Sequence, residues 1–190
     1  EGDPFTKLSL DKSIANLKAR NIFKDVNYKI SEGTAKNLKS IDISVEEKPT
    51  GEISAGAGIG TNGGSFAFNV QENNYLGEGK NVGFNIEIDQ ESLKGTLNYT
   101  NPNYDFLGNA LRYYVSSETN DQPDQGYENT IIGAGISTTF EQYNDVYTTL
   151  GINAVHDDLQ TIDSASASLK KQSGTFDEIS GSYGFSFDKR

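Results

Sequence analysis

Large apolar side chains recur at every second position from about residue 52 almost to the end of the chain. The alternation is clearest in Phe66-Ala-Phe68-Asn-Val70 and Val82-Gly-Phe84-Asn-Ile86-Glu-Ile88, where the intervening residues are small or polar. Strict alternation is typical of β-strands with one apolar face. It continues, less regularly toward the end, through residues 93–99, 111–115, 132–136, 146–154 and 183–187. The pattern predicts about eight strands of roughly 8–12 residues each, and hence a mainly β fold.

The first fifty residues follow a different pattern. Three apolar residues recur at helical spacing, namely Leu10, Ile14 and Leu17. Thr6 precedes them as a candidate helix N-cap. Asp25–Ile30 and Ser40–Val45 then alternate like strands, and Pro49 followed by Gly51 marks a break in the chain. We therefore expect a helix–strand–strand unit at residues 1–50 and an all-β unit without a convincing helix at residues 51–190.

A glycine motif at the start of the second unit invites another interpretation. Gly58-Ile-Gly60-Thr-Asn-Gly63 has the spacing of the loop that cradles a pyrophosphate in dinucleotide-binding folds. That loop must be followed by a helix, whereas here Ser65–Val70 alternates as a strand. Asn-Gly within residues 61–64 is a strong hairpin signal. The sequence therefore predicts a turn between two strands and no cofactor site.

Alternation alone fits a soluble sandwich with its apolar face inside or a membrane barrel with that face toward lipid. The connections favour the barrel. Those expected at 61–64, 89–92, 117–128 and 157–175 lengthen along the chain, whereas those at 73–80, 101–108 and 141–145 stay short. The short ones are rich in aromatic residues: Tyr75, Tyr104, Phe106, Phe140 and Tyr143. Long loops on one side and an aromatic girdle on the other are typical of a transmembrane antiparallel β-barrel.

The amino-acid composition disfavours several classes of function. The 190 residues carry a net charge of −11, which disfavours nucleic acid as a partner, and there is no cysteine for a disulfide or a thiol nucleophile. The mean hydropathy of −0.58 fits strands with one face in water. No catalytic triad or paired carboxylate stands out, and His156 beside Asp157 is expected in a solvated loop. We therefore predict no enzyme activity, no metal and no cofactor.

Several motifs together resemble the BamA-like outer-membrane barrel-assembly family, in which periplasmic POTRA domains precede a bacterial surface antigen barrel. Residues similar to the closing part of a POTRA domain are Leu10-Asp-Lys-Ser-Ile14, 17–26 and 41–51. Residues similar to the barrel are Gly56-Ala-Gly-Ile-Gly60-Thr, Asn74-Tyr-Leu-Gly77-Glu-Gly79 and Thr100-Asn101-Pro102-Asn-Tyr104. The resemblance implies that residues 1–50 are the C-terminal part of a POTRA domain. It implies that residues 51–190 are the N-terminal half of an outer-membrane barrel, so that the chain is a fragment of a longer protein.

The resemblance also implies a function, which is to fold and insert other β-barrel proteins in the bacterial outer membrane, with the N-terminal domain in the periplasm. Client strands would pair at a lateral gate formed by Glu52, Ile53, Ser54, Ala55, Gly56, Ala57, Gly58, Ile59 and Gly60. Asn101, Pro102 and Tyr104 would form a periplasmic turn. The implied partners are unfolded outer-membrane clients, the lipid bilayer and accessory assembly lipoproteins. The residues alone leave open a passive porin, a small closed eight-stranded barrel, or a soluble all-β binding protein.

Overall fold

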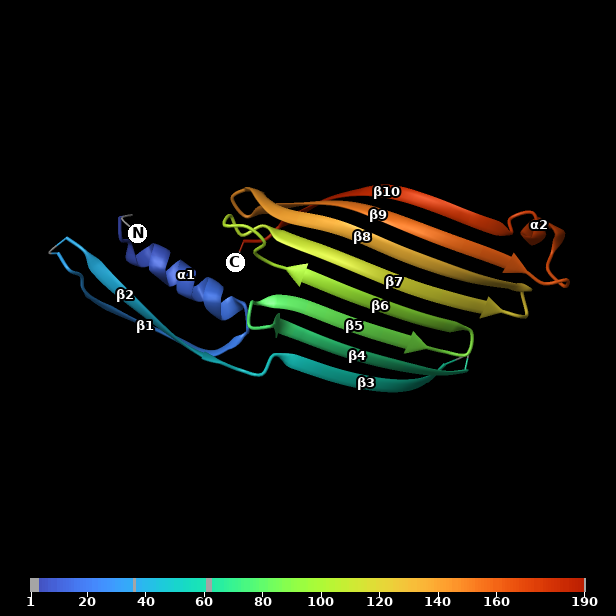
Figure 1. The fold of residues 1–190 in the computed structure, drawn as a ribbon, viewed down its shortest axis with the longest axis horizontal. Helices are drawn as coiled ribbons and strands as arrows, with labels where there is room; N and C mark the ends of the chain where they lie inside the picture. The colour runs from blue at the N-terminus through green and yellow to red at the C-terminus, as the bar shows by residue number, and fades with distance from the viewer. Residues whose placement is uncertain (1–3, 36, 61–62, 190) are drawn as a thin grey trace. The chain divides into compact units, whose positions relative to one another are not determined.

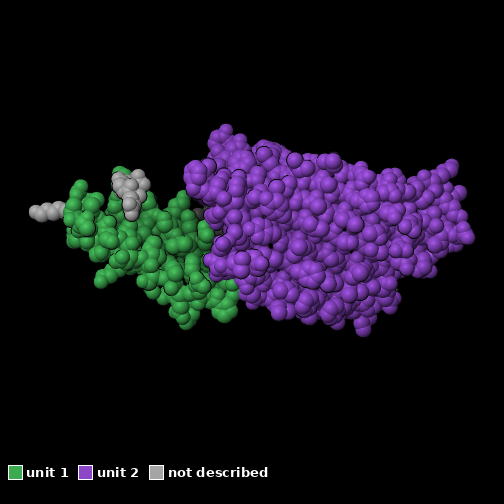
Figure 2. Space-filling view, viewed as in Figure 1, with its two compact units in different colours: residues 1–50 green, residues 51–190 purple. Residues whose placement is uncertain are grey.

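The computed structural model describes residues 4–35, 37–60 and 63–189. The chain divides into two compact units, residues 1–50 and 51–190, which are coloured separately in Figure 2.

The first unit is a helix followed by a two-stranded antiparallel sheet, as the sequence predicts. Its elements are α1 (Lys7–Ala19), β1 (Phe23–Glu32) and β2 (Lys39–Glu47). Thr6 caps the helix, because its side-chain oxygen accepts a hydrogen bond from the Ser9 backbone N–H at 3.2 Å. Leu10 and Ile14 pack against Val26 of β1 to form the small core, with Leu17 and Phe23 at its margin. The helical spacing of these residues is what allows one face of α1 to cover the sheet.

The second unit is a single antiparallel sheet of eight strands in the order β10-β9-β8-β7-β6-β5-β4-β3. The strands are β3 (Gly51–Gly60), β4 (Gly63–Tyr75), β5 (Lys80–Ile88), β6 (Ser92–Asn101), β7 (Ala110–Gln122), β8 (Tyr127–Tyr143), β9 (Val146–Thr161) and β10 (Gly174–Phe187). Each strand lies beside its neighbours in the sequence (Figure 1). The predicted mainly β fold with eight antiparallel strands is confirmed. The sheet is not closed, because β3 and β10 are its two edges, so the small closed barrel is not the structure of this chain.

The strand register sorts the side chains of the second unit onto two faces. Residues directly opposite one another in paired strands lie on the same face, and following the pairs from strand to strand gathers the large apolar residues on one of them. We call this the apolar face: Ile53, Ala55, Ala57, Ile59, Phe66, Phe68, Val70, Val82, Phe84, Ile86, Ile88, Leu93, Leu97, Tyr99, Leu111, Tyr113, Val115, Ile132, Ala134, Ile136, Leu150, Ile152, Ala154, Ile179, Tyr183, Phe185 and Phe187. The opposite, polar face carries mostly Ser, Thr, Asn, Gly and charged residues.

Within the described residues of the second unit, no element packs on the apolar face. Many of its large side chains are exposed, with Phe84 at 40% and Phe187 at 70% of full accessibility, and the others are half-buried. Among the described residues of the second unit, Ala165 is the one buried hydrophobic residue. A soluble sandwich would bury this face in a dry interior, so the structure does not support that alternative. An apolar face of this extent on a folded sheet requires an apolar medium or a partner.

The connections differ most from the prediction in two places, although the strands also extend into the expected connections at 73–80 and 141–145. The expected loop at 117–128 is largely strand, because β7 and β8 continue pairing to Gln122 and Tyr127 and leave residues 123–126 as a turn. The expected loop at 157–175 shortens to 162–173 and contains the short helix α2 (Ala167–Lys170), which the sequence did not suggest. Thr61 and Asn62 of the predicted hairpin turn lie outside the described residues. In the described part of the chain, no helix combines the length and apolarity needed to cross a membrane.

Candidate strand-pairing edge

Strand β3 is an edge strand and contains all nine residues predicted for the lateral gate. It pairs with β4 along one side, from Gly51↔Glu72 to Gly60↔Gly63, and no strand of the described residues pairs with its other side. All ten of its residues are exposed. The free side of such a strand presents a row of backbone N–H and C=O groups that another strand can bind.

The side chains of β3 continue both faces of the sheet. Ile53, Ala55, Ala57 and Ile59 belong to the apolar face, and the two alanines lie opposite the large side chains of Phe68 and Phe66. Glu52, Ser54, Gly56, Gly58 and Gly60 belong to the polar face. The edge therefore offers a strand with small residues at its centre and the same two-sided character as the rest of the sheet.

Two of the four glycines of β3, Gly56 and Gly60, have free space around them. A Cβ added at Gly56 or Gly60 would meet no heavy atom within 4 Å, and one at Gly58 would lie 3.1 Å from Ser65 Oγ. Crowding therefore does not account for glycine at positions 56 and 60 in this chain. Glycine within a strand weakens it by about 0.5–1 kcal/mol relative to alanine. The consequence is an edge with little side-chain packing on its polar face.

Gly135 in β8 shows the opposite situation, which the sequence did not reveal. Here an added Cβ would lie 2.4 Å from Tyr114 Cε1 and 2.5 Å from Asn153 Oδ1. The Tyr114 ring from β7 lies over Gly135, and its hydroxyl donates a hydrogen bond to Asn153 Oδ1 of β9 at 3.0 Å. A glycine in the middle strand thus lets a long side chain on the polar face join two strands that are not neighbours.

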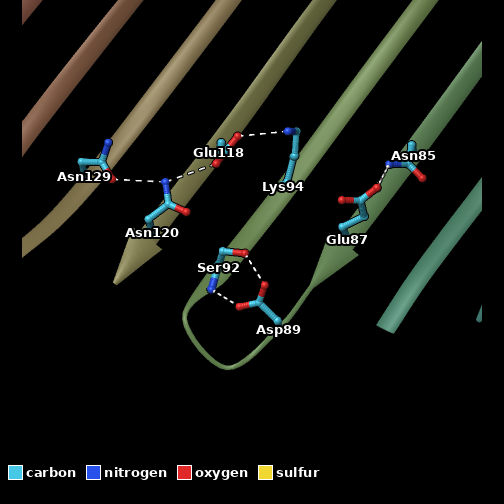
Figure 3. A network of polar contacts seen from close by, with 8 residues as sticks. All are labelled: Asn85, Glu87, Asp89, Ser92, Lys94, Glu118, Asn120 and Asn129. Carbon is cyan, nitrogen blue, oxygen red and sulfur yellow. Dashed lines mark hydrogen bonds and ion pairs between the residues drawn. The ribbon is translucent and has the colours of Figure 1, made fainter. Parts of the chain in front are cut away.

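Charged side chains form a network on the polar face near the turn between β5 and β6 (Figure 3). Lys94 Nζ lies 3.2 Å from Glu118 Oε2, and Asn85 Nδ2 donates to Glu87 Oε1 at 3.0 Å. The Asp89 carboxylate holds the turn by accepting hydrogen bonds from the Ser92 hydroxyl and from the backbone N–H groups of Glu91 and Ser92. These hydrogen bonds, that of the Ser92 hydroxyl first, lower the pKa of Asp89 below its ordinary value.

The predicted turn residues lie where β6 ends and in the turn before β7, which contains Pro102 and Tyr104. Asn101 ends β6, and its Oδ1 accepts a hydrogen bond from the Asn103 N–H at 3.2 Å. The Tyr104 N–H donates to the Asn109 carbonyl at 2.9 Å. Asp105, which sequence reasoning missed, accepts from both the backbone and the side chain of Asn109. Burial acts to raise the pKa of Asp105, but hydrogen bonds led by those from Asn109 outweigh it and lower the value.

The short turns share one end of the sheet, because β4–β5, β6–β7 and β8–β9 are alternate connections of an antiparallel meander. Exposed aromatic residues collect there: Tyr75, Tyr104, Phe106 and Tyr143. Phe106 is 96% exposed, which is unusual for so apolar a side chain in water. The amphipathic rings of the three tyrosines suit the boundary between lipid and water.

His156 lies in strand β9 and not in the loop that we expected. Its Nδ1 is 2.7 Å from Asp177 Oδ1 in β10. The prediction of a loop at His156 was wrong because strand β9 extends well beyond the apolar alternation. Within the described residues, no group of three or more His, Asp or Glu side chains is arranged to hold a metal ion.

The comparisons with known proteins agree with this geometry. A family model described as the Omp85 superfamily domain matches residues 74–190, which is more than half of the chain. The chain therefore belongs to the Omp85 superfamily.

The chain is also similar to two individual proteins. The chain is 26% identical over 196 residues to the outer membrane protein assembly factor BamA of Neisseria meningitidis serogroup B, a match that covers 96% of this chain and 24% of that protein. The chain thus spans about a quarter of the length of this relative. The crystal structure of BamA from Haemophilus ducreyi lacking POTRA domains 1–3 matches with a TM-score of 0.76 at 20% identity, over 100% of this chain and 40% of that one. This second match speaks for the fold.

Proposed function

We propose that this chain is part of an outer-membrane assembly factor that folds and inserts other β-barrel proteins by pairing their strands at β3. Residues 1–50 would be the closing part of a periplasmic POTRA domain, and residues 51–190 the first half of the barrel. The single observation that carries the proposal is that β3 is an unpaired edge whose apolar residues continue the apolar face of the sheet.

The medium around β3 determines how strongly its free edge attracts another strand. With the apolar face in lipid, the free N–H and C=O groups of β3 would lie at membrane depth, where each unsatisfied group costs several kcal/mol. A client strand in the same medium has the same unmet groups. Pairing of the two edges satisfies both sets, and backbone hydrogen bonds provide the affinity without demanding one particular client sequence.

The composition of β3 makes that pairing reversible. Its three glycines on the polar face together lower the stability of strand packing by about 1.5–3 kcal/mol relative to alanine. A strand that pairs strongly through its backbone but weakly through its side chains can exchange one partner for another. This property suits a site that must release each finished client.

The partners follow from the same proposal. They are unfolded outer-membrane proteins at β3, the lipid bilayer on the apolar face, and accessory assembly lipoproteins on the periplasmic side. The helix–strand–strand architecture of residues 1–50 supports the POTRA assignment. The exposed aromatic residues of the short turns support the proposal that this end of the sheet lies at the periplasmic surface of the membrane.

A disulfide staple in the complete protein tests the proposal. Ser54→Cys in β3, paired with a cysteine in the last strand of the barrel, should stop client insertion in reconstituted vesicles, and a reductant should restore it. A control staple joins Thr96→Cys to Ser116→Cys, which lie opposite each other in the already paired strands β6 and β7. The control should leave insertion unchanged. Normal client insertion by the stapled seam would refute strand pairing at β3.

A further inference from the structure

A hollow on the polar face opens beside the free edge of β3. It encloses about 490 Å³, and its floor is made of small residues of β3 and β4, namely Gly56, Gly58, Ser65 and Ala67. Its far wall carries Glu87, Asp89, Lys94 and Glu118. The wall therefore holds three carboxylates and one amine, which gives it a net negative charge.

The strand register explains why the hollow reaches the edge. Gly56, Ala67, Glu87, Lys94 and Glu118 stand opposite one another in successive strands, so they form one row across the polar face. The two residues nearest the free edge, Gly56 and Ala67, have the smallest side chains of the row. A Cβ at Gly56 would meet no heavy atom of the described residues within 4 Å, so the hollow is open at its edge over Gly56.

The carboxylates around the hollow differ in whether they have a cationic partner. Lys94 lies opposite Glu87 in register, yet its Nζ pairs with Glu118. Asp89 is engaged by Ser92 in the turn. Glu87 accepts a hydrogen bond from Asn85, and no cation lies within ion-pair distance of it among the described residues. Figure 3 shows Glu87 bonded to Asn85, whereas Lys94 is paired with Glu118. Glu87 is thus the carboxylate of the row that remains for a further cation to pair with.

The chain already contains a long side chain that crosses over a glycine of the neighbouring strand. Tyr114 crosses Gly135 on the polar face and reaches Asn153 of the strand beyond it. A strand that paired with β3 would place an inward-facing residue beside Gly56 just as Tyr114 is placed beside Gly135. That residue would cross Gly56 and Ala67, so only a long side chain comes near Glu87.

We propose that the hollow receives a lysine or arginine side chain from the strand that pairs with β3, at the inward-facing position opposite Gly56, and that Glu87 attracts its charge. The inference rests on the proposed function and deepens it, because it names a chemical preference at one position of the client strand. The apolar face of β3 sets no such demand, since its own residues are uncharged.

Strand peptides bound to the 190-residue chain in lipid vesicles test the inference. Fluorescently labelled peptides copy residues 63–72, with Lys, Gln or Glu in place of Ala67, and a photo-crosslinker on the peptide reports whether binding occurs at β3. The Lys peptide should bind about two- to fivefold more tightly than the Gln peptide, the range of a half-exposed ion pair, and the Glu peptide more weakly than both. Added salt should reduce the difference.

Two variants decide whether Glu87 is responsible. Glu87→Gln should bring the affinities of the Lys and Gln peptides together without changing that of the Gln peptide. The matched control, Glu178→Gln, removes a carboxylate from the polar face of β10 and should keep the preference; circular dichroism checks that both variants fold. Equal binding of the Lys and Gln peptides, or a preference that survives Glu87→Gln, overturns the inference but leaves strand pairing at β3 intact. Failure of every peptide to crosslink to β3 overturns the proposed function together with it.

Discussion

Replacing Gly135 with alanine should destabilise the sheet, although alanine is in general the better residue within a strand. The new Cβ would stand 2.4 Å from Tyr114 Cε1, so the ring must move and lose its hydrogen bond to Asn153. The lost hydrogen bond costs about 0.5–1.5 kcal/mol, and the overpacking about 1–3 kcal/mol. Alanine returns about 0.5–1 kcal/mol relative to glycine. The free energy of unfolding should therefore fall by about 2 kcal/mol.

Urea unfolding of the chain in lipid vesicles measures this change. Circular dichroism is the suitable signal, because the chain contains no tryptophan. Gly56→Ala is the matched control, since its Cβ meets no heavy atom within 4 Å. It should raise the free energy of unfolding by about 0.5–1 kcal/mol, so the same chemical change has opposite signs at the two positions.

A second background isolates the role of the tyrosine. In a Tyr114→Ala chain the ring is gone, and Gly135→Ala should then cost little or stabilise the sheet. The reasoning is refuted if Gly135→Ala is as stable as the parent chain. It is equally refuted if the loss is the same with and without Tyr114, because the penalty would then come from something other than the crossing ring.

Two further predictions test the medium and the turns. Phe84→Arg on the apolar face should cost about 2–4 kcal/mol in vesicles if that face meets hydrocarbon, whereas Asn85→Arg on the polar face should cost little; equal costs would contradict the assignment of the faces. Hydrogen bonds from Ser92 and Glu91 lower the folded-state pKa of Asp89 below its ordinary value of 3.8, so its contribution to stability is present above that pH and is lost as the pH falls through the lowered value. Urea titrations at a series of pH values should accordingly show a smaller acid-induced loss for Asp89→Asn than for the parent chain, and identical pH profiles would contradict the role of this carboxylate.

The two faces of the sheet could be predicted because the side-chain period of a strand is two. Phe84 and Leu97 belong to alternating runs, and pairing such runs as neighbours leaves only one arrangement of faces that keeps the apolar residues together. The helix of the first unit was equally accessible, since its capping residue and its apolar spacing lie close together in the sequence.

The strand ends could not be predicted in the same way. β7 and β8 continue beyond the apolar alternation because polar side chains join them: Thr119 with Thr130, and Asn120 with Asn129. Such pairs depend on which residues face each other across the ladder, and composition alone makes them look like a loop. The crossing of Tyr114 over Gly135 is still less visible in the sequence, because it joins residues of three strands.

The meander has a consequence for how the sheet is built. Because every strand of the second unit pairs with its immediate neighbours in the sequence, the backbone ladder can be completed hairpin by hairpin, and no strand waits for a distant segment of chain. Topologies dominated by local contacts fold faster than those that must first close long loops. Each completed hairpin also leaves a new template for the next, so the sheet can lengthen at a margin without disturbing the strands already in place.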